Sequence, residues 1–134
     1  MKIHPLLLFS LLVTLCTFCR VALSDSEGIS AETIVGEWHA SEDHPDRGKI
    51  DTVFVINADT TFSGSLSINS EPVWQYSGIW KLEGNRITWE YRKSSLVLLQ
   101  EDKAETDEIL SVTDTDLTYR SVRRGTENIL HRTR

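Results

Sequence analysis

Apolar and polar residues alternate along most of this chain with a period of two, the pattern of strands with one face in a core and the other in water. Residues 61–68 show it most clearly, because Phe62, Leu66 and Ile68 alternate with threonine and serine. The same alternation predicts strands at 34–41, 52–56, 74–82, 86–92, 107–112, 117–122 and 127–131. Residues 96–99 form a continuous apolar run, which we expect to be a short strand buried on both faces.

Turn sequences rich in Asn, Asp and Gly separate these segments, as at residues 57–60 and 83–85. Helical periodicity is limited to a single turn at 30–33. Eight or nine strands spaced about 8–12 residues apart indicate an all-β antiparallel meander. Such a meander closes most simply into a β-barrel, because closure removes the exposed edge strands.

The first 24 residues have the pattern of a secretory signal peptide. Lys2 gives a basic start, residues 6–19 form an apolar stretch, and Ala22-Leu23-Ser24 supplies small residues for a cleavage site. The apolar stretch is shorter than the about 20 residues that a transmembrane helix needs. We therefore expect a secreted or periplasmic protein with a signal peptide at 1–24, a flexible arm at 25–33 and one domain at 34–134.

Cleavage changes the composition that bears on function. The full chain has 14 Lys+Arg and 20 Asp+Glu, and loss of Lys2 and Arg20 leaves a net charge of −8. An acidic chain is a poor partner for nucleic acid or anionic membranes, so we expect neither nucleic-acid binding nor membrane insertion after cleavage. Both cysteines, Cys16 and Cys19, are removed with the leader, which excludes disulfides and cysteine-type zinc sites.

The order of short motifs resembles the small bacterial lipocalin-like domains of the calycin superfamily. The motifs are Gly36-Glu37-Trp38, the hairpin at 59–64, and the segments 76–87 and 109–117. The resemblance implies an up-and-down barrel of eight antiparallel strands. It also implies that Gly36 and Trp38 belong to a structural plug at one end, and that a basic side chain from a late strand packs over the indole. The candidates for that side chain are Arg120, Arg123 and Arg132.

Seven aromatic side chains fall on the inward faces of the predicted strands. They are Phe54, Phe62, Trp74, Tyr76, Trp80, Trp89 and Tyr91. Barrels of this size can hold one small molecule, so these side chains are candidates to line a pocket for an apolar or amphipathic ligand. They could equally fill the interior, and the sequence leaves both arrangements open.

The remaining chemistry is sparse. His39, His44 and Asp46 are ligand types for a divalent metal, but their spacing matches no known site, so we interpret the segment as a solvated acidic loop. No serine lies in a nucleophile elbow, and no cysteine remains after cleavage. Asp107 and Glu108 are interpreted as solvating acids. We therefore expect no enzymatic activity, no cofactor and no metal.

The expected function is binding of a small apolar or amphipathic molecule by a monomeric barrel. The alternative is a protein-binding module of the cell envelope, such as a protease inhibitor or an immunity-type protein, which the acidic surface and the arm at 25–33 would suit. An aromatic cavity of about 300 Å³ or more would favour the ligand. A filled barrel with an exposed apolar patch would favour the protein partner.

Overall fold

The computed structural model describes residues 28–133. The predicted signal peptide, and residues 25–27 of the predicted arm, lie outside the described residues. Within the described range, no helix has the length and apolar character needed to cross a membrane.

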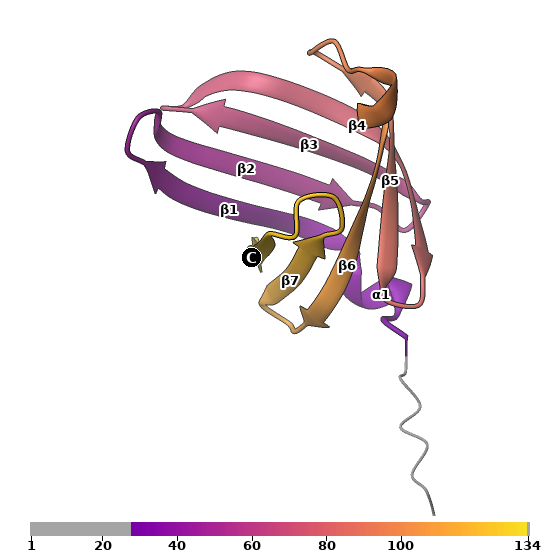
Figure 1. Cartoon of the computed structure of the whole chain (residues 1–134). Coiled ribbons are helices and arrows are strands. Elements are labelled where there is room, and N and C mark those ends of the chain that lie inside the picture. The colour runs from indigo at the N-terminus through magenta and orange to yellow at the C-terminus, as the bar shows by residue number, and fades with distance from the viewer. Residues whose placement is uncertain (1–27, 134) are drawn as a thin grey trace, which may run out of the picture.

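Eight antiparallel strands form a closed barrel in which each strand pairs with the next one in the sequence (Figure 1). The strands are β1 (Gly36–His44), β2 (Gly48–Ile56), β3 (Thr61–Ile68), β4 (Glu71–Glu83), β5 (Arg86–Ser94), β6 (Ala104–Val112), β7 (Asp116–Ser121) and β8 (Glu127–Arg132). A one-turn helix, α1 (Ala31–Ile34), precedes β1, and a 3-10 turn, η1 (Gln100–Asp102), precedes β6. The predicted all-β, eight-stranded up-and-down barrel is confirmed.

Two glycines let the wall of the barrel curve and its interior fill. A β-bulge between Ser77 and Gly78 shifts the register of β4 against β5. A Cβ on Gly78 would collide with the carbonyl oxygen of Glu90, so only glycine allows this approach. Gly64 lies opposite Tyr76 across β3 and β4, and the tyrosine ring occupies the space that a side chain at 64 would take.

One end of the barrel is closed by α1 and by Trp38, which is 0% exposed. The Trp38 Nε1 donates a hydrogen bond of 2.8 Å to the carbonyl oxygen of Ile34, the last residue of α1. The guanidinium carbon of Arg132 lies 4.1 Å from the centroid of the Trp38 ring. Arg132 is therefore the basic side chain that packs over the indole, whereas Arg120 and Arg123 pair with acidic side chains elsewhere.

Arg132 also ties three segments of the chain together at this end. Its guanidinium donates to the carbonyl oxygens of Val35 at 2.9 Å and Thr33 at 2.8 Å, and its Nε donates to that of Asp114 at 3.1 Å. These carbonyls lie before β1 and between β6 and β7. The last strand is thus held to the N-terminal segment by side-chain as well as backbone contacts.

The buried apolar core continues from this plug into the barrel. Its members are Ile34, Trp38, Ile56, Phe62, Trp80, Ile87, Trp89, Ile109, Leu117 and Leu130. Most lie in the halves of the strands nearest α1. Hydrophobic burial therefore stabilises the closed end of the barrel more than the opposite end.

The pairing that closes the barrel is short. β1 pairs with β2 from Gly36↔Ile56 to His44↔Gly48, but with β8 only through Trp38↔Arg132 and His39↔His131. Both of these pairs lie near the plugged end. In the described barrel, the part of β1 beyond His39 has no register partner in β8, so the closing seam is confined to one end.

The prediction of a strand at residues 96–99 is wrong. These residues belong to the loop between β5 and β6, where Val97 is 100% exposed and Leu99 is 63% exposed. β5 pairs directly with β6, which begins at Ala104 rather than at 107, so the closed sheet has no position for an extra strand. Ile34, predicted in the first strand, ends α1 instead.

Candidate functional site

A cavity of about 460 Å³ occupies the interior of the barrel, and Ile34 of α1 forms part of its lining at the plugged end. It extends from the buried Ile56, Ile87 and Leu130 to residues near the opposite rim, such as Arg47 and Thr126. Within the described barrel, the register pairs of β1 with β8 do not extend to this end. The barrel is therefore plugged at one end and hollow at the other.

Five of the seven predicted aromatic residues line this cavity: Phe54, Trp74, Tyr76, Trp89 and Tyr91. Their rings contact one another in a continuous wall. The Trp74 and Tyr76 centroids are 4.3 Å apart, those of Tyr76 and Tyr91 are 5.5 Å apart, and those of Phe54 and Trp89 are 4.8 Å apart. Edge-to-face and tilted pairs of this kind hold the rings in fixed orientations.

The other two predicted residues, Phe62 and Trp80, face inward but do not line the cavity. Phe62 is 1% exposed and stacks on Phe54 at 5.5 Å, which places it in the core behind the aromatic wall. Trp80 is buried near the plugged end, where its Nε1 donates a hydrogen bond of 3.0 Å to the carbonyl oxygen of Asn57. Both residues support the barrel rather than form the pocket.

The cavity also has a polar side that the sequence analysis missed. Glu105 and Asp107 of β6, and Tyr119 of β7, line it beside Trp89 and Tyr91 of the neighbouring strand β5. Asp107, interpreted above as a solvating acid, is only 8% exposed, and that interpretation is wrong. Glu105 precedes the strand predicted at 107–112, but it lies in β6, which begins at Ala104. The sequence did contain a signal for this. Glu105 and Asp107 are spaced by two from the apolar Ile109, so on a strand all three lie on the same face.

Hydrogen bonds fix the two carboxylates to the aromatic wall. The Trp89 Nε1 donates to Asp107 Oδ2 at 2.8 Å, and the Tyr91 hydroxyl donates to Glu105 Oε2 at 3.4 Å. Burial raises the pKa of Asp107 from 3.8 to about 6, with a further contribution from Glu105, and the Trp89 hydrogen bond opposes this rise. Burial likewise raises the pKa of Tyr119 to about 12, and both carboxylates add to the rise.

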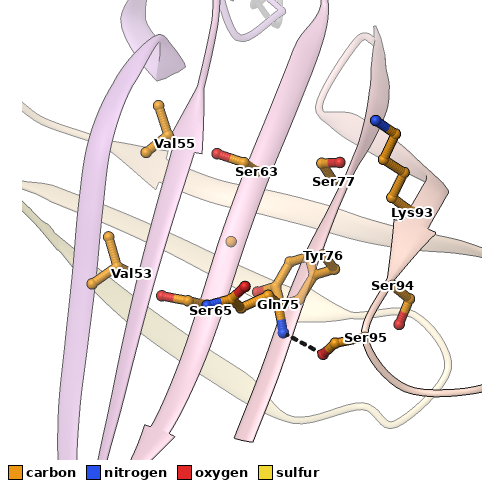
Figure 2. A pocket seen from close by; sticks show the side chains of 11 residues that line it. Val53, Val55, Ser63, Ser65, Gln75, Tyr76, Ser77, Lys93, Ser94 and Ser95 are labelled. Atoms are coloured by element: carbon orange, nitrogen blue, oxygen red, sulfur yellow. Dashed lines mark hydrogen bonds between the residues drawn. The ribbon is translucent and has the colours of Figure 1, made fainter. Parts of the chain in front are cut away.

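A second depression lies on the outside of the barrel and is chemically bland. Figure 2 shows side chains that line it: Val53 of β2, Ser63 and Ser65 of β3, Ser77 of β4 and Lys93 of β5. Its volume is about 540 Å³. Its serine hydroxyls and two valines, Val53 and Val55, form neither an enclosed apolar surface nor a convergent set of charges. Ligand sites are concave and bury most of their ligand, so the interior cavity is the better candidate although its volume is smaller.

The structure does not bring together the three residues that were weighed as metal ligands. His39 and His44 are separated by five positions on β1, so their side chains leave opposite faces of the strand. The His44 Nδ1 accepts a hydrogen bond of 3.2 Å from the backbone N–H of Asp46. Across residues 28–133, no three His, Cys, Asp or Glu side chains are grouped as metal ligands.

We predict that zinc leaves the melting temperature unchanged. A metal bound only by the folded protein would raise its stability by RT ln(1 + [L]/Kd), so about tens of micromolar zinc would reveal any site of useful affinity. Differential scanning calorimetry with and without zinc measures this directly. A rise of several degrees that is absent from His44→Ala would contradict the prediction.

Comparisons with known proteins bear on the fold. No protein-family model and no curated protein matches the chain. Among solved structures, the NMR structure of a protein from Bacteroides uniformis is similar to it, with a TM-score of 0.55 and 18% sequence identity. The match covers 80% of this chain and 94% of that chain. At this level of identity the likeness extends to the barrel fold alone.

Proposed function

We propose that this protein is a lipocalin-like barrel of the calycin type that binds a small amphipathic molecule in its interior. The cavity of about 460 Å³, walled by five aromatic side chains, is the observation that carries the proposal. Ligand pockets have volumes of about 300–1,000 Å³ and combine an apolar lining with a few placed polar groups. The aromatic wall and the carboxylates of Glu105 and Asp107 meet both criteria.

The pocket is also partly preformed. Cross-ring contacts and the hydrogen bonds of Trp74 to Ser94 Oγ at 2.8 Å and of Trp89 to Asp107 hold both indoles in place. A wall fixed before binding loses little side-chain entropy when the ligand enters. Together with the predicted signal peptide, this favours a secreted or periplasmic binding protein without enzymatic activity.

A protein partner is the second candidate, and the loop between β5 and β6 favours it. Leu96, Val97 and Leu99 are exposed on this loop. Exposed apolar side chains gathered on one loop are a feature of interaction sites. A protein-binding role of the cell-envelope type would use this loop and would leave the interior empty.

Binding of a neutral apolar probe tests the ligand proposal. N-phenyl-naphthylamine is expected to bind the purified domain and to quench tryptophan emission, because Trp74 and Trp89 line the cavity. Trp74→Ala should raise the dissociation constant about tenfold, since it removes a large apolar contact. Ile79→Ala is the matched control, because Ile79 lies on the same strand with its side chain exposed.

Equal effects of the two substitutions would contradict an interior pocket. Melting temperatures of both variants must stay close to that of the wild type, so that weaker binding reflects the pocket wall rather than unfolding. Native mass spectrometry of protein purified from its host adds an independent measurement. A retained small mass would support the ligand, and a co-purified protein lost in Val97→Ser would support the second candidate.

A further inference from the structure

The interior cavity has an unusual charge distribution. Glu105 and Asp107 lie two positions apart on β6, so both carboxylates project to the inner face of the strand. Both line the cavity. None of the ion pairs formed within residues 28–133 includes either of them. Two of the three acidic residues that line the cavity, Glu105 and Asp107, therefore lie side by side without a paired cation from the described part of the protein, and the third is Glu42.

Asp107 is more than nine-tenths buried, and only one of its oxygens is used. Oδ2 accepts the hydrogen bond of 2.8 Å from Trp89, whereas no hydrogen bond within the described residues reaches Oδ1. Within the described residues no buried side-chain oxygen lacks a hydrogen-bond partner, so the unbonded Oδ1 is accessible from the cavity. A donor group of a molecule in the cavity can therefore reach this oxygen and replace its hydration.

The positive groups of the site lie elsewhere. Arg47 and Arg124 line the cavity at its rim, and both are exposed to solvent. The charge of Arg124 lowers the pKa of Asp107, but burial raises it by more. Asp107 is buried, so the inner part of the cavity is negative, whereas the exposed part of its lining carries Arg47, Arg124 and the acidic Glu42.

The aromatic wall next to these carboxylates is suited to a cation. Trp74, Tyr76 and Tyr91 contact one another, with centroids between 4.3 and 5.8 Å apart. The Tyr91 hydroxyl connects this group to Glu105. Ammonium groups bind the negative faces of aromatic rings, most strongly where water is excluded. A carboxylate pair beside an aromatic group is a combination that recognises an organic cation.

We propose that the ligand of this barrel is an organic amine: an apolar, ring-sized body in the aromatic part of the cavity, with a protonated amino group bound by Glu105 and Asp107. This inference rests on the proposed function, because it specifies the chemistry of the molecule bound in the same cavity. The ammonium group donates to Asp107 Oδ1 and to Glu105, and its single positive charge lies between the two carboxylates and reduces the repulsion between them. A carboxylate-bearing ligand would meet two like charges instead.

Isothermal titration calorimetry with three matched probes tests the proposal. Naphthylethylamine, naphthylethanol and naphthylacetate share one ring system and differ in charge. The amine is expected to bind at least about tenfold more tightly than the alcohol, because charge-assisted hydrogen bonds in a desolvated site exceed neutral ones. The carboxylate is expected to bind most weakly, because like charges repel across the low-dielectric interior.

Two conservative variants locate the effect. Asp107→Asn and Glu105→Gln keep the shape of the side chains and remove the charge, so each should weaken amine binding about tenfold. Their affinity for naphthylethanol should change by less than about twofold, since that probe makes no ionic contact. Asp43→Asn is the control, because Asp43 is an exposed acid on β1 outside the cavity.

The outcomes separate the two proposals. Equal binding of all three probes, unaffected by Asp107→Asn and Glu105→Gln, would overturn the amine ligand and leave the binding barrel standing. Tighter binding of naphthylacetate would also overturn the amine and assign recognition to Arg47 and Arg124. Failure of all three probes to bind a folded protein would overturn the interior site itself, and with it the proposed function.

Discussion

Replacing Trp38 by alanine is expected to lower the free energy of unfolding by about 3–5 kcal/mol, the usual cost of deleting a fully buried aromatic side chain. Trp38 is 0% exposed, its Nε1 satisfies the carbonyl of Ile34, and Arg132 packs on its ring at 4.1 Å. The substitution would leave a cavity at the plugged end and remove the ring on which the Arg132 guanidinium packs. Urea denaturation followed by circular dichroism measures the loss.

Trp38→Phe is the matched control for this experiment. It keeps most of the apolar volume and a ring beneath Arg132, and it removes the hydrogen bond to Ile34, so about 1–2 kcal/mol should be lost. A Trp38→Ala variant that unfolds within about 1 kcal/mol of the wild type would show that α1 and Arg132 close the barrel without the indole.

Replacing Asp107 by asparagine is expected to stabilise the ligand-free protein at about pH 7, by roughly 1–3 kcal/mol. The pKa of Asp107 is raised to about 6 in the folded protein, from 3.8. The folded state therefore binds the proton more tightly than the unfolded state does. Protonation favours folding, so the contribution of Asp107 to stability falls as the pH rises from about 4 through 6. Asparagine accepts the Trp89 hydrogen bond without bearing a charge.

Parallel urea titrations of wild type and Asp107→Asn between about pH 4 and 8 test this linkage. The difference in unfolding free energy should be largest above pH 6 and should shrink towards pH 4. Asp43→Asn, which removes an exposed acid, should show no such trend. A constant difference across the range would mean that Asp107 titrates alike in the folded and unfolded states.

The stability and the amine binding of Asp107→Asn together test whether Asp107 serves recognition. A buried carboxylate destabilises the ligand-free protein, and replacing it by an amide of the same shape would remove this cost. The needs of folding therefore do not explain why an acid occupies position 107. Groups of this kind are characteristic of functional sites, where binding compensates for their desolvation. Stabilisation of Asp107→Asn combined with weaker amine binding would therefore be the signature of a recognition residue.

The barrel itself could be predicted because period-two alternation is imposed by the pleat of the strand. Each residue that faces inward on one strand pairs with an inward residue on its neighbour, as in Trp38↔Phe54 and Phe54↔Gly64. The sequence therefore identified the inward face of β2, β3 and β4 residue by residue. Local bulges shift the register but leave the inward face continuous.

Position along the barrel axis was harder to predict. Phe62 and Trp80 follow the same alternation as Tyr76 and Tyr91, yet the first two pack at the plugged end and the others line the cavity. The position of a residue along the barrel axis depends on the register between neighbouring strands, and the sequence of one strand does not determine that register. Asp107 was missed for a related reason, since an acid in a strand resembles a surface residue until its neighbours are placed.

The prediction of a strand at residues 96–99 was wrong because it relied on hydrophobicity alone, and an apolar run without alternation does not specify a strand. The closed sheet already joins β5 to β6 directly, so these residues remain in a loop despite their composition. Their exposure would be costly in an isolated protein and is the main support for a protein-binding surface.

The short seam between β1 and β8 also sets the order in which the molecule can fold. All other strand pairings join neighbours in the sequence, and such hairpins form quickly from local contacts. Closing the seam must bring residue 132 back to residue 38, which carries the largest loss of chain entropy. The curved sheet would therefore assemble first and close last. Until the C-terminal strand is in place the cavity is incomplete, because Asn128 and Leu130 of β8 form part of its lining.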